Sequence, residues 1–200
     1  MKIILFGATG TIGKCVKEVL SESGHEVISV GRSSGDLKLN IEDAASVREL
    51  YKKIGSFDAV ASAVGEVSFA PLTELTKDNW TNSLNSKLLG QVNLVQEAIP
   101  FINEKGSFTL ISGILSDTPI AQGVIATAVN RAVEGFAVAA ACELPKSLRI
   151  NVVSPTMLEE AKESYGPFFP GFQPVAGKLV AEAYKKSIMG IQTGQIFKLH

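Results

Sequence analysis

The sequence predicts an α/β fold in which helices flank both faces of a doubly wound parallel sheet. Short apolar runs alternate with amphipathic helical stretches along the chain, which is the pattern of successive βαβ units. The first apolar run, residues 2–6, leads through a glycine-rich turn into a helix-forming stretch. The 200 residues contain no internal repeat, low-complexity tract or linker. We therefore expect residues 1–200 to form a single domain.

Apolar periodicity gives the expected order of the elements. Strands are expected where short apolar runs occur, at residues 2–6, 26–30, 37–41, 57–63, 107–112, 149–154 and 195–199. Helices are expected where apolar residues recur every three or four positions, at residues 14–20, 42–54, 80–102, 126–144 and 177–189. Residues 156–176 show no clear period.

Composition and charge exclude several classes of protein. A formal net charge of −1 gives no field that would attract nucleic acid or an anionic membrane. No apolar run approaches the roughly 20 residues that span a bilayer, and the N-terminal run is too short for a signal peptide. Cys15 and Cys142 lie far apart, and His25 and His200 are isolated. We therefore expect buried thiols, a cytoplasmic protein and no metal site.

The glycine-rich turn after the first strand is the strongest functional signal. Glycines at this place let the backbone approach a pyrophosphate, which the N–H groups and dipole of the next helix attract. The alternative is a tight strand-to-helix turn without a ligand. The residues expected to contact a dinucleotide here are Gly7, Thr9, Gly10, Thr11, Ile12 and Gly13.

The end of the second strand favours one form of the cofactor. An acidic residue about 20 positions past the glycine turn would bind the ribose 2′-hydroxyl of NAD. This sequence has Arg32 and Ser33 there instead. A guanidinium and a hydroxyl suit a 2′-phosphate, so NADP(H) is favoured over NAD(H). The alternative is an exposed turn that carries an incidental arginine.

Four motifs together resemble those of the short-chain dehydrogenase/reductase family. They are residues 7–13, 40–43, 58–65 and 149–155, which extend over most of the chain. The resemblance implies a Rossmann-type fold, a nicotinamide cofactor and the interconversion of a carbonyl and an alcohol. It also implies which further residues lie along the cofactor: Asn40 and Ile41 near the adenine, Ala61, Ser62 and Ala63 beside its length, and Pro155 and Thr156 at the nicotinamide.

The catalytic residues of that family are missing from the matching positions. The family uses a tyrosine as proton donor, a lysine four residues later and a serine about thirteen residues upstream. Those positions hold Ala126, Asn130 and Gly113, with Ser112 one residue before the serine position. The chain contains no Tyr-x-x-x-Lys sequence.

Lysine and asparagine are exchanged between two of these positions, which suggests that Lys87 replaces the missing lysine. Lys87 stands where the family has an asparagine in the preceding helix, while Asn130 stands at the lysine position. We hypothesise that Lys87 Nζ lies within direct or one-water reach of the Asn130 side chain and binds the ribose or substrate oxygen. The alternative is a solvated helix lysine. Lys87, Asn130 and Ser112 are therefore the candidate catalytic residues.

Two further segments bear on ligands and partners. Residues 157–175 carry an aromatic, proline-rich sequence where the family has a substrate-covering loop, which suits an apolar ligand or simply fills the core. The helix at 126–144 is apolar on most faces. Because family members commonly dimerise through this helix and the long one before it, a homodimer or homotetramer is expected.

Two functions follow from these observations. The first is an NADP(H)-dependent oxidoreductase that acts on a small carbonyl or alcohol with atypical catalytic machinery. The second is a non-catalytic NADP(H)-binding sensor or regulatory protein.

Overall fold

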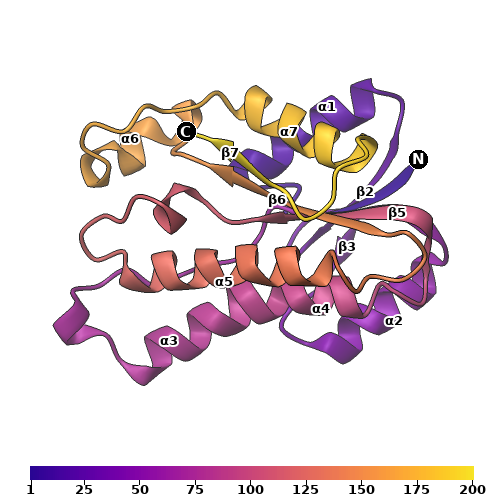
Figure 1. Ribbon diagram of the computed structural model, residues 1–200, viewed down its shortest axis with the longest axis horizontal. Coiled ribbons are helices and arrows are strands. Elements are labelled where there is room, and N and C mark those ends of the chain that lie inside the picture. The colour runs from indigo at the N-terminus through magenta and orange to yellow at the C-terminus, as the bar shows by residue number, and fades with distance from the viewer.

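A single seven-stranded parallel sheet forms the centre of the protein. The computed structural model describes residues 1–200, and the strand order is β3-β2-β1-β4-β5-β6-β7. Figure 1 shows the sheet between two layers of helices. The predicted α/β fold is confirmed. The strands are β1 Lys2–Phe6, β2 Glu26–Gly31, β3 Leu37–Lys38, β4 Phe57–Ser62, β5 Ile102–Ile111, β6 Arg149–Pro155 and β7 Ile196–Leu199.

Helices cover both faces of the sheet, and each face has its own apolar core. On one face, α1 (Thr11–Glu22) and α7 (Gly177–Met189) lie side by side. On the other lie α2 (Ala44–Ile54), α4 (Gly90–Gln96) and α5 (Val124–Ala140). Buried strand residues alternate between the two cores, as the two-residue period of a strand requires.

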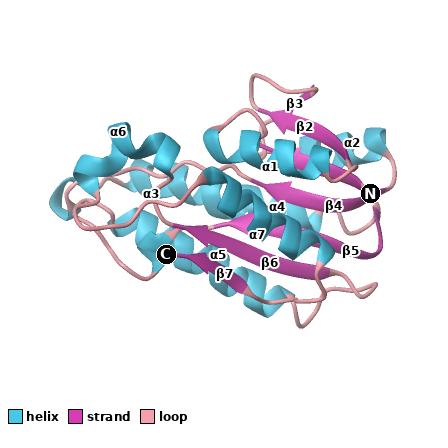
Figure 2. Cartoon of the chain, turned by 90° about the horizontal axis from the view of Figure 1, so that it is seen from above, coloured by secondary structure: helices cyan, strands magenta, loops and turns pink.

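The strand order places a crevice at the carboxyl edge of the sheet. The chain leaves β1 in one direction to β2 and β3, and later returns on the other side of β1 to β4. Ligands of open α/β sheets bind where the strand order reverses in this way. Two short helices, α3 (Lys77–Ser83) and α6 (Lys162–Tyr165), project beyond this edge (Figure 2).

The helix expected at residues 80–102 is interrupted and ends early. A π-helical turn, Leu84–Leu89, separates α3 from α4, which ends at Gln96 ahead of Pro100. The fully buried Gln91 side chain donates to the carbonyl oxygens of Lys87 at 2.8 Å and Ile111 at 3.0 Å, and accepts from the Ile111 N–H at 2.9 Å. The turn is thereby attached to β5, whose first residue, Ile102, pairs with Phe57.

Other boundaries differ from the prediction in ways that have local causes. The strand expected at 37–41 has only two residues, because the chain then leaves the sheet to line the crevice. The irregular region 156–176 contains α6 and two short 3₁₀ turns. The expectation of two buried thiols is wrong, because Cys142 follows the end of α5 and is exposed. No helix has the length and apolar character needed to cross a bilayer.

Candidate functional site

The turn between β1 and α1 is closed so tightly that only glycine fits. Gly7 has φ 83°, and a Cβ added there would lie 2.6 Å from the carbonyl oxygen of Ala63. A Cβ at Gly13 would collide with the carbonyl oxygen of Gly7. These approaches bring the start of α1 directly against the end of β1.

The N-terminus of α1 has no internal partner. Its N-cap residue, Gly10, has no side chain to accept from the first N–H groups, and the first turn contains no acidic residue. Free N–H groups and the positive end of the helix dipole attract an anion. The turn therefore fits the pyrophosphate of a dinucleotide.

A cleft of about 500 Å³ lies beside this turn at the crevice of the sheet. Six of the residues expected at the cofactor line it: Gly7, Gly10, Arg32, Asn40, Ile41 and Ala63. The other lining residues were not among those expected to contact the cofactor: Phe6, Val30, Gly31, Leu39, Val64, Gly65, Glu66, Ser86 and Tyr165. Glu66 and Ser86 reach the cleft because the Glu66 N–H donates to Ser86 Oγ at 3.1 Å.

The remaining residues expected at the cofactor lie outside this cleft. Thr9 Oγ1 is 2.9 Å from Ser34 Oγ, and Ser33 is exposed in the same loop. Thr11 and Ile12 line a neighbouring hollow, and Gly13 is buried within α1. The other four are buried at strand ends: Ala61, Ser62, Pro155 and Thr156.

Ala61 and Ser62 are buried because they lie at the end of β4, a central strand with a neighbouring strand on each side. Neither has any accessible surface. Ala61 pairs with Leu5 and Thr109 on its two sides. The Ser62 carbonyl oxygen accepts from the hydroxyl of Tyr184 in α7 at 2.6 Å. Only the next residue, Ala63, emerges into the cleft.

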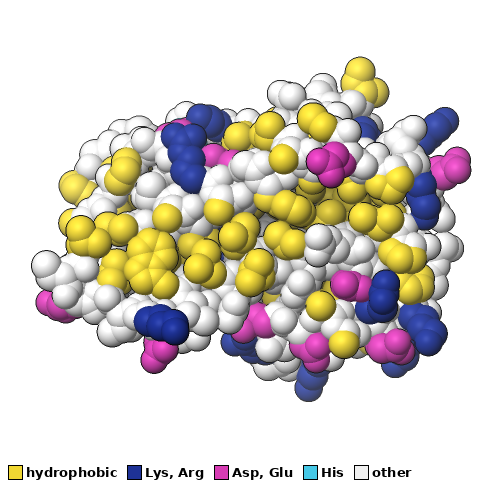
Figure 3. All heavy atoms as spheres, turned by 60° about the horizontal axis from the view of Figure 1, so that its bottom comes forward, with side chains coloured by type: hydrophobic (Ala, Val, Ile, Leu, Met, Phe, Trp, Pro, Cys, Tyr) yellow, Lys and Arg dark blue, Asp and Glu magenta, His cyan; other side chains and the backbone are white.

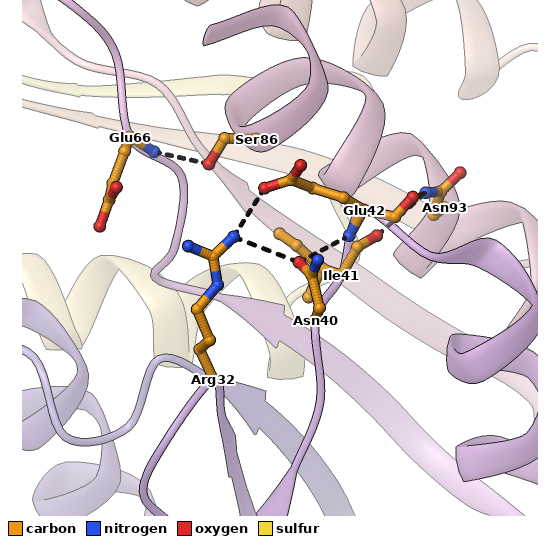
Figure 4. A network of polar contacts seen from close by, with 7 residues as sticks. All are labelled: Arg32, Asn40, Ile41, Glu42, Glu66, Ser86 and Asn93. Carbon is orange, nitrogen blue, oxygen red and sulfur yellow. Dashed lines mark hydrogen bonds and ion pairs between the residues drawn. The ribbon is translucent and has the colours of Figure 1, made fainter. Parts of the chain in front are cut away.

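Arg32 is held by a polar network at the outer end of the cleft, shown in Figure 4. Its Nη2 lies 2.7 Å from Glu42 Oε1 and 3.3 Å from Asn40 Oδ1. The ion pair with Glu42 was not expected from the sequence, and its only signal was an acidic residue two positions after Asn40. Arg32 is 63% exposed at its side chain, so a ligand can reach it.

The positions of the family's serine and tyrosine differ in how well they would accept those residues. A Cβ at Gly113 would lie 3.5 Å from Asn130 Nδ2 and 3.7 Å from the Pro155 carbonyl oxygen, which is ordinary contact. Ala126 is buried in an apolar cluster against which Phe169 and Phe172 of the aromatic segment pack. Apolar side chains therefore gather where a tyrosine would be needed.

Ser112 and Asn130 differ in their hydrogen bonding. Ser112 Oγ donates to the buried Glu134 carboxylate at 2.8 Å, so its hydroxyl is committed within the protein. Asn130 Nδ2 makes a long 3.5 Å contact with the Gly113 carbonyl oxygen, and its buried Oδ1 has no partner. A buried amide oxygen without a donor is costly and indicates a place for water or a ligand.

Lys87 lies in the π-helical turn, and its side chain packs against Gly65 of the cleft wall. Its ammonium makes no hydrogen bond or ion pair with the protein, including Asn130, so no direct bond joins the exchanged pair. A one-water bridge between them stays a prediction. Burial lowers the pKa of Lys87 from 10.5 to about 8. Single-turn π-helical bulges occur frequently at functional sites.

The aromatic segment encloses two small apolar hollows beside the cleft. One of about 260 Å³ is lined by Thr11, Ile12, Phe69, Met157, Leu158, Ala161, Tyr165 and Phe169. A second of about 140 Å³ is lined by Phe69, Ile120, Ala121, Gln122, Tyr165, Phe168 and Phe169. Tyr165 borders the cleft and both hollows, and no charged residue lines either hollow. No group of three or more His, Cys, Asp or Glu residues could hold a metal ion.

Comparisons with known proteins show the family and the fold to which the chain is similar. Residues 2–188 match a family model described as enoyl-(acyl carrier protein) reductase. The chain is 26% identical over 167 residues to a 3-ketodihydrosphingosine reductase of Bacteroides thetaiotaomicron, and 23% identical over 154 residues to an uncharacterised oxidoreductase of Methylorubrum extorquens. These alignments cover 76% of this chain in each case, but only 62% and 61% of the two relatives.

Solved structures give the same picture of the fold. The protein lin1944 from Listeria innocua is 48% identical, with a TM-score of 0.97 and full coverage of both chains. A small-chain dehydrogenase solved in complex with NADPH is 23% identical, with a TM-score of 0.88 and coverage of 100% of this chain and 96% of its own.

The lowered pKa of Lys87, whose side chain is partly buried, makes the stability of the fold depend on pH. Below pH 8 the lysine is protonated in both the folded and unfolded states, so the folded state bears the full cost of burying the charge. That cost declines between about pH 8 and 10.5. We expect Lys87→Met to raise the free energy of unfolding at pH 7 by about 1–2 kcal/mol.

Urea unfolding of both proteins between pH 7 and 10.5 measures this difference, which should shrink as the pH rises. Lys53→Met, at an exposed position of α2, serves as the matched control and should show no such trend. A stability difference at Lys87 that is independent of pH would contradict the burial of its charge.

Proposed function

The chain belongs to the short-chain dehydrogenase/reductase family of oxidoreductases, and on this premise we propose that it is an NADP(H)-dependent oxidoreductase of a small, apolar carbonyl or alcohol. The observation that carries the proposal is the uncapped N-terminus of α1, which faces the cleft at the reversal of strand order. The family match over residues 2–188 supports nucleotide binding at this place.

Different residues of the cleft are proposed to bind different parts of the cofactor. The unpartnered N–H groups of Thr11, Ile12 and Gly13 bind the pyrophosphate, and Asn40, Ile41 and Ala63 contact the adenosine. Arg32 binds the 2′-phosphate through charge-assisted hydrogen bonds, which favours NADP(H). When bound, the nicotinamide exchanges a hydride with the substrate.

Lys87 is the proposed proton donor in place of the missing tyrosine. An amine with a pKa of about 8 is mostly protonated at neutral pH and can still lose its proton easily, which suits a general acid. No protein group competes for its ammonium. Asn130, whose Oδ1 lacks a partner, is the proposed positioning residue for the water or substrate that Lys87 meets.

The hollows beneath the aromatic segment indicate the class of substrate. Apart from Thr11 and Gln122 their walls are apolar or aromatic, and they offer no cation to bind a carboxylate or phosphate. Burial of apolar surface therefore supplies the binding energy. We propose an uncharged substrate with its carbonyl beside Lys87 and its apolar part beneath Tyr165 and Phe169.

A second function is favoured by one specific observation. Ala126 lies in an apolar cluster covered by Phe169 and Phe172, so the space above the catalytic position is already filled by the chain. This arrangement suits a non-catalytic protein that binds NADP(H) as a sensor or regulatory subunit. Hydride transfer to a carbonyl substrate distinguishes the two functions.

A homodimer is proposed on the face that α4 and α5 form. Figure 3 shows hydrophobic side chains gathered across this side of the molecule. They include exposed Leu89 and Val138, and an apolar groove of about 310 Å³ lined in part by Ile99 and Phe136. The resemblance to the family favours a second copy of this chain as the occupant.

The cofactor assignment predicts tight binding of NADPH that depends on Arg32. Titration followed by nicotinamide fluorescence should give a lower dissociation constant for NADPH than for NADH. Arg32→Ala should weaken NADPH about 10–100-fold and NADH little, because the lost hydrogen bonds are to a charged phosphate. Arg48→Ala, which also removes an exposed, ion-paired arginine, is the control. An equal loss for both cofactors would contradict the assignment.

The proton-donor assignment predicts a rate that depends on the charge of Lys87. Carbonyl reduction should decline as the pH rises above about 8, since the amine loses the proton it donates. Lys87→Met should reduce the rate by about 10²–10⁴-fold and remove this pH limb. A pre-steady-state assay of NADPH oxidation against a panel of apolar aldehydes and ketones measures both. NADPH binding without turnover of any substrate would favour the sensor.

The dimer assignment predicts that one charge on α5 dissociates the protein. Val138 is 46% exposed, and Val138→Glu should convert a sedimenting dimer into monomers, because the charge would be buried in the interface. Leu179→Glu on α7 is the matched control, since Leu179 is 57% exposed on the opposite layer. A wild-type protein that sediments as a monomer would contradict the proposal.

A further inference from the structure

The guanidinium proposed to bind the 2′-phosphate already has a carboxylate partner. Arg32 Nη2 lies 2.7 Å from Glu42 Oε1, a charge-assisted hydrogen bond of good length (Figure 4). Glu42 lies in the segment between β3 and α2, ten residues further along the chain. A phosphate that binds Arg32 must therefore displace this carboxylate or share the guanidinium with it.

Hydrogen bonds to the backbone of Glu42 and of its two neighbours in the sequence hold this segment in place. Its N–H donates to Asn40 Oδ1 at 3.3 Å, and Asn93 Nδ2 donates to the carbonyl oxygens of Ile41 at 2.9 Å and Glu42 at 3.4 Å. The next residue, Asp43, caps α2 by accepting from the Ala45 and Ser46 N–H groups. The carboxylate is thus presented to Arg32 from a constrained loop.

The surroundings of the pair are acidic. Beyond Arg32 lies a polar hollow of about 450 Å³ lined by Arg32, Glu42, Glu66, Val67, Ser68, Asn82, Ser83 and Ser86. Two carboxylates thus face one guanidinium there. The 2′-phosphate of NADP(H) carries nearly two negative charges at neutral pH and is repelled by this wall, whereas the 2′-hydroxyl of NAD(H) carries none.

We infer that Glu42 is a specificity-determining residue that restrains the preference for NADP(H). Its carboxylate competes with the 2′-phosphate for Arg32, and it offers an acceptor to the 2′-hydroxyl of NAD(H). The inference rests on the proposed function, because it takes the cleft as a dinucleotide site. The two side chains act in opposite directions. The Arg32 guanidinium favours NADP(H), and the Glu42 carboxylate reduces the difference in affinity between NADP(H) and NAD(H).

The exchange is possible because neither partner is locked in the core. The Glu42 side chain is 30% exposed and the Arg32 side chain 63%. A carboxylate at such a position can return to water when the guanidinium turns to a phosphate. NADPH binding therefore includes the cost of breaking the pair and of like-charge repulsion, whereas NADH binding includes neither.

The test is a set of cofactor titrations followed by nicotinamide fluorescence. Glu42→Gln keeps the shape of the side chain and removes its charge. We expect it to lower the dissociation constant of NADPH about tenfold and to change that of NADH less than about threefold. Glu66→Gln removes a carboxylate from the same wall that is not paired with Arg32, and should change NADPH binding much less. In the Arg32→Ala background, Glu42→Gln should lose most of its effect.

The outcomes separate this inference from the proposed function. Equal strengthening of both cofactors by Glu42→Gln, or an equal effect of Glu66→Gln, would show general charge repulsion and overturn the competition for Arg32. If the wild type binds NADPH through Arg32 and Glu42→Gln changes nothing, the inference fails while the cofactor assignment stands. If neither cofactor binds any variant that retains its circular dichroism and melting temperature, the proposed function fails, and the inference fails with it.

Discussion

The close approach of α1 to the end of β1 is the constraint on which the rest of the site depends. Gly7 and Gly13 allow this approach because a side chain at either would collide with backbone atoms. The approach directs the uncapped first turn of α1 at the crevice, where the order of strands reverses. The other groups of the candidate site lie around this turn and the adjacent cleft, which polar side chains and Tyr165 of the aromatic segment also line.

The two halves of the site have different physical character. The half that lies on β1, α1 and β2 has close-packed glycines, an uncapped helix N-terminus and the exposed cation of Arg32. In the half on β5 and α5, Phe169 and Phe172 pack against the apolar cluster that contains Ala126. Lys87, in the π-helical turn that contacts α5, has an ammonium without a protein partner, and burial lowers its pKa to about 8.

Long-range side-chain contacts explain where local patterns misled. The pattern over residues 80–102 is amphipathic and predicts one helix, but Gln91 binds the π-helical turn to Ile111, and residue 102 joins the sheet. Ser112 is bonded to Glu134, 22 positions away. Arg32 appeared free as a phosphate ligand, although Glu42 neutralises it. In each case the hydrogen-bond or ion-pair partner is ten or more residues away in the sequence, and the periodicity of apolar residues gives no information on such contacts.

The sequence by itself determined the class of fold and the glycine-rich turn between β1 and α1. Strand and helix periods are local, and a glycine needed for close approach is visible as a glycine, so both could be read without coordinates. The tertiary structure alone decided which predicted cofactor residues line the cleft, why Ala61 and Ser62 do not, and which charges meet at Arg32. Those features depend on how separate segments pack against one another, and the identity of a residue does not specify its neighbours across the fold.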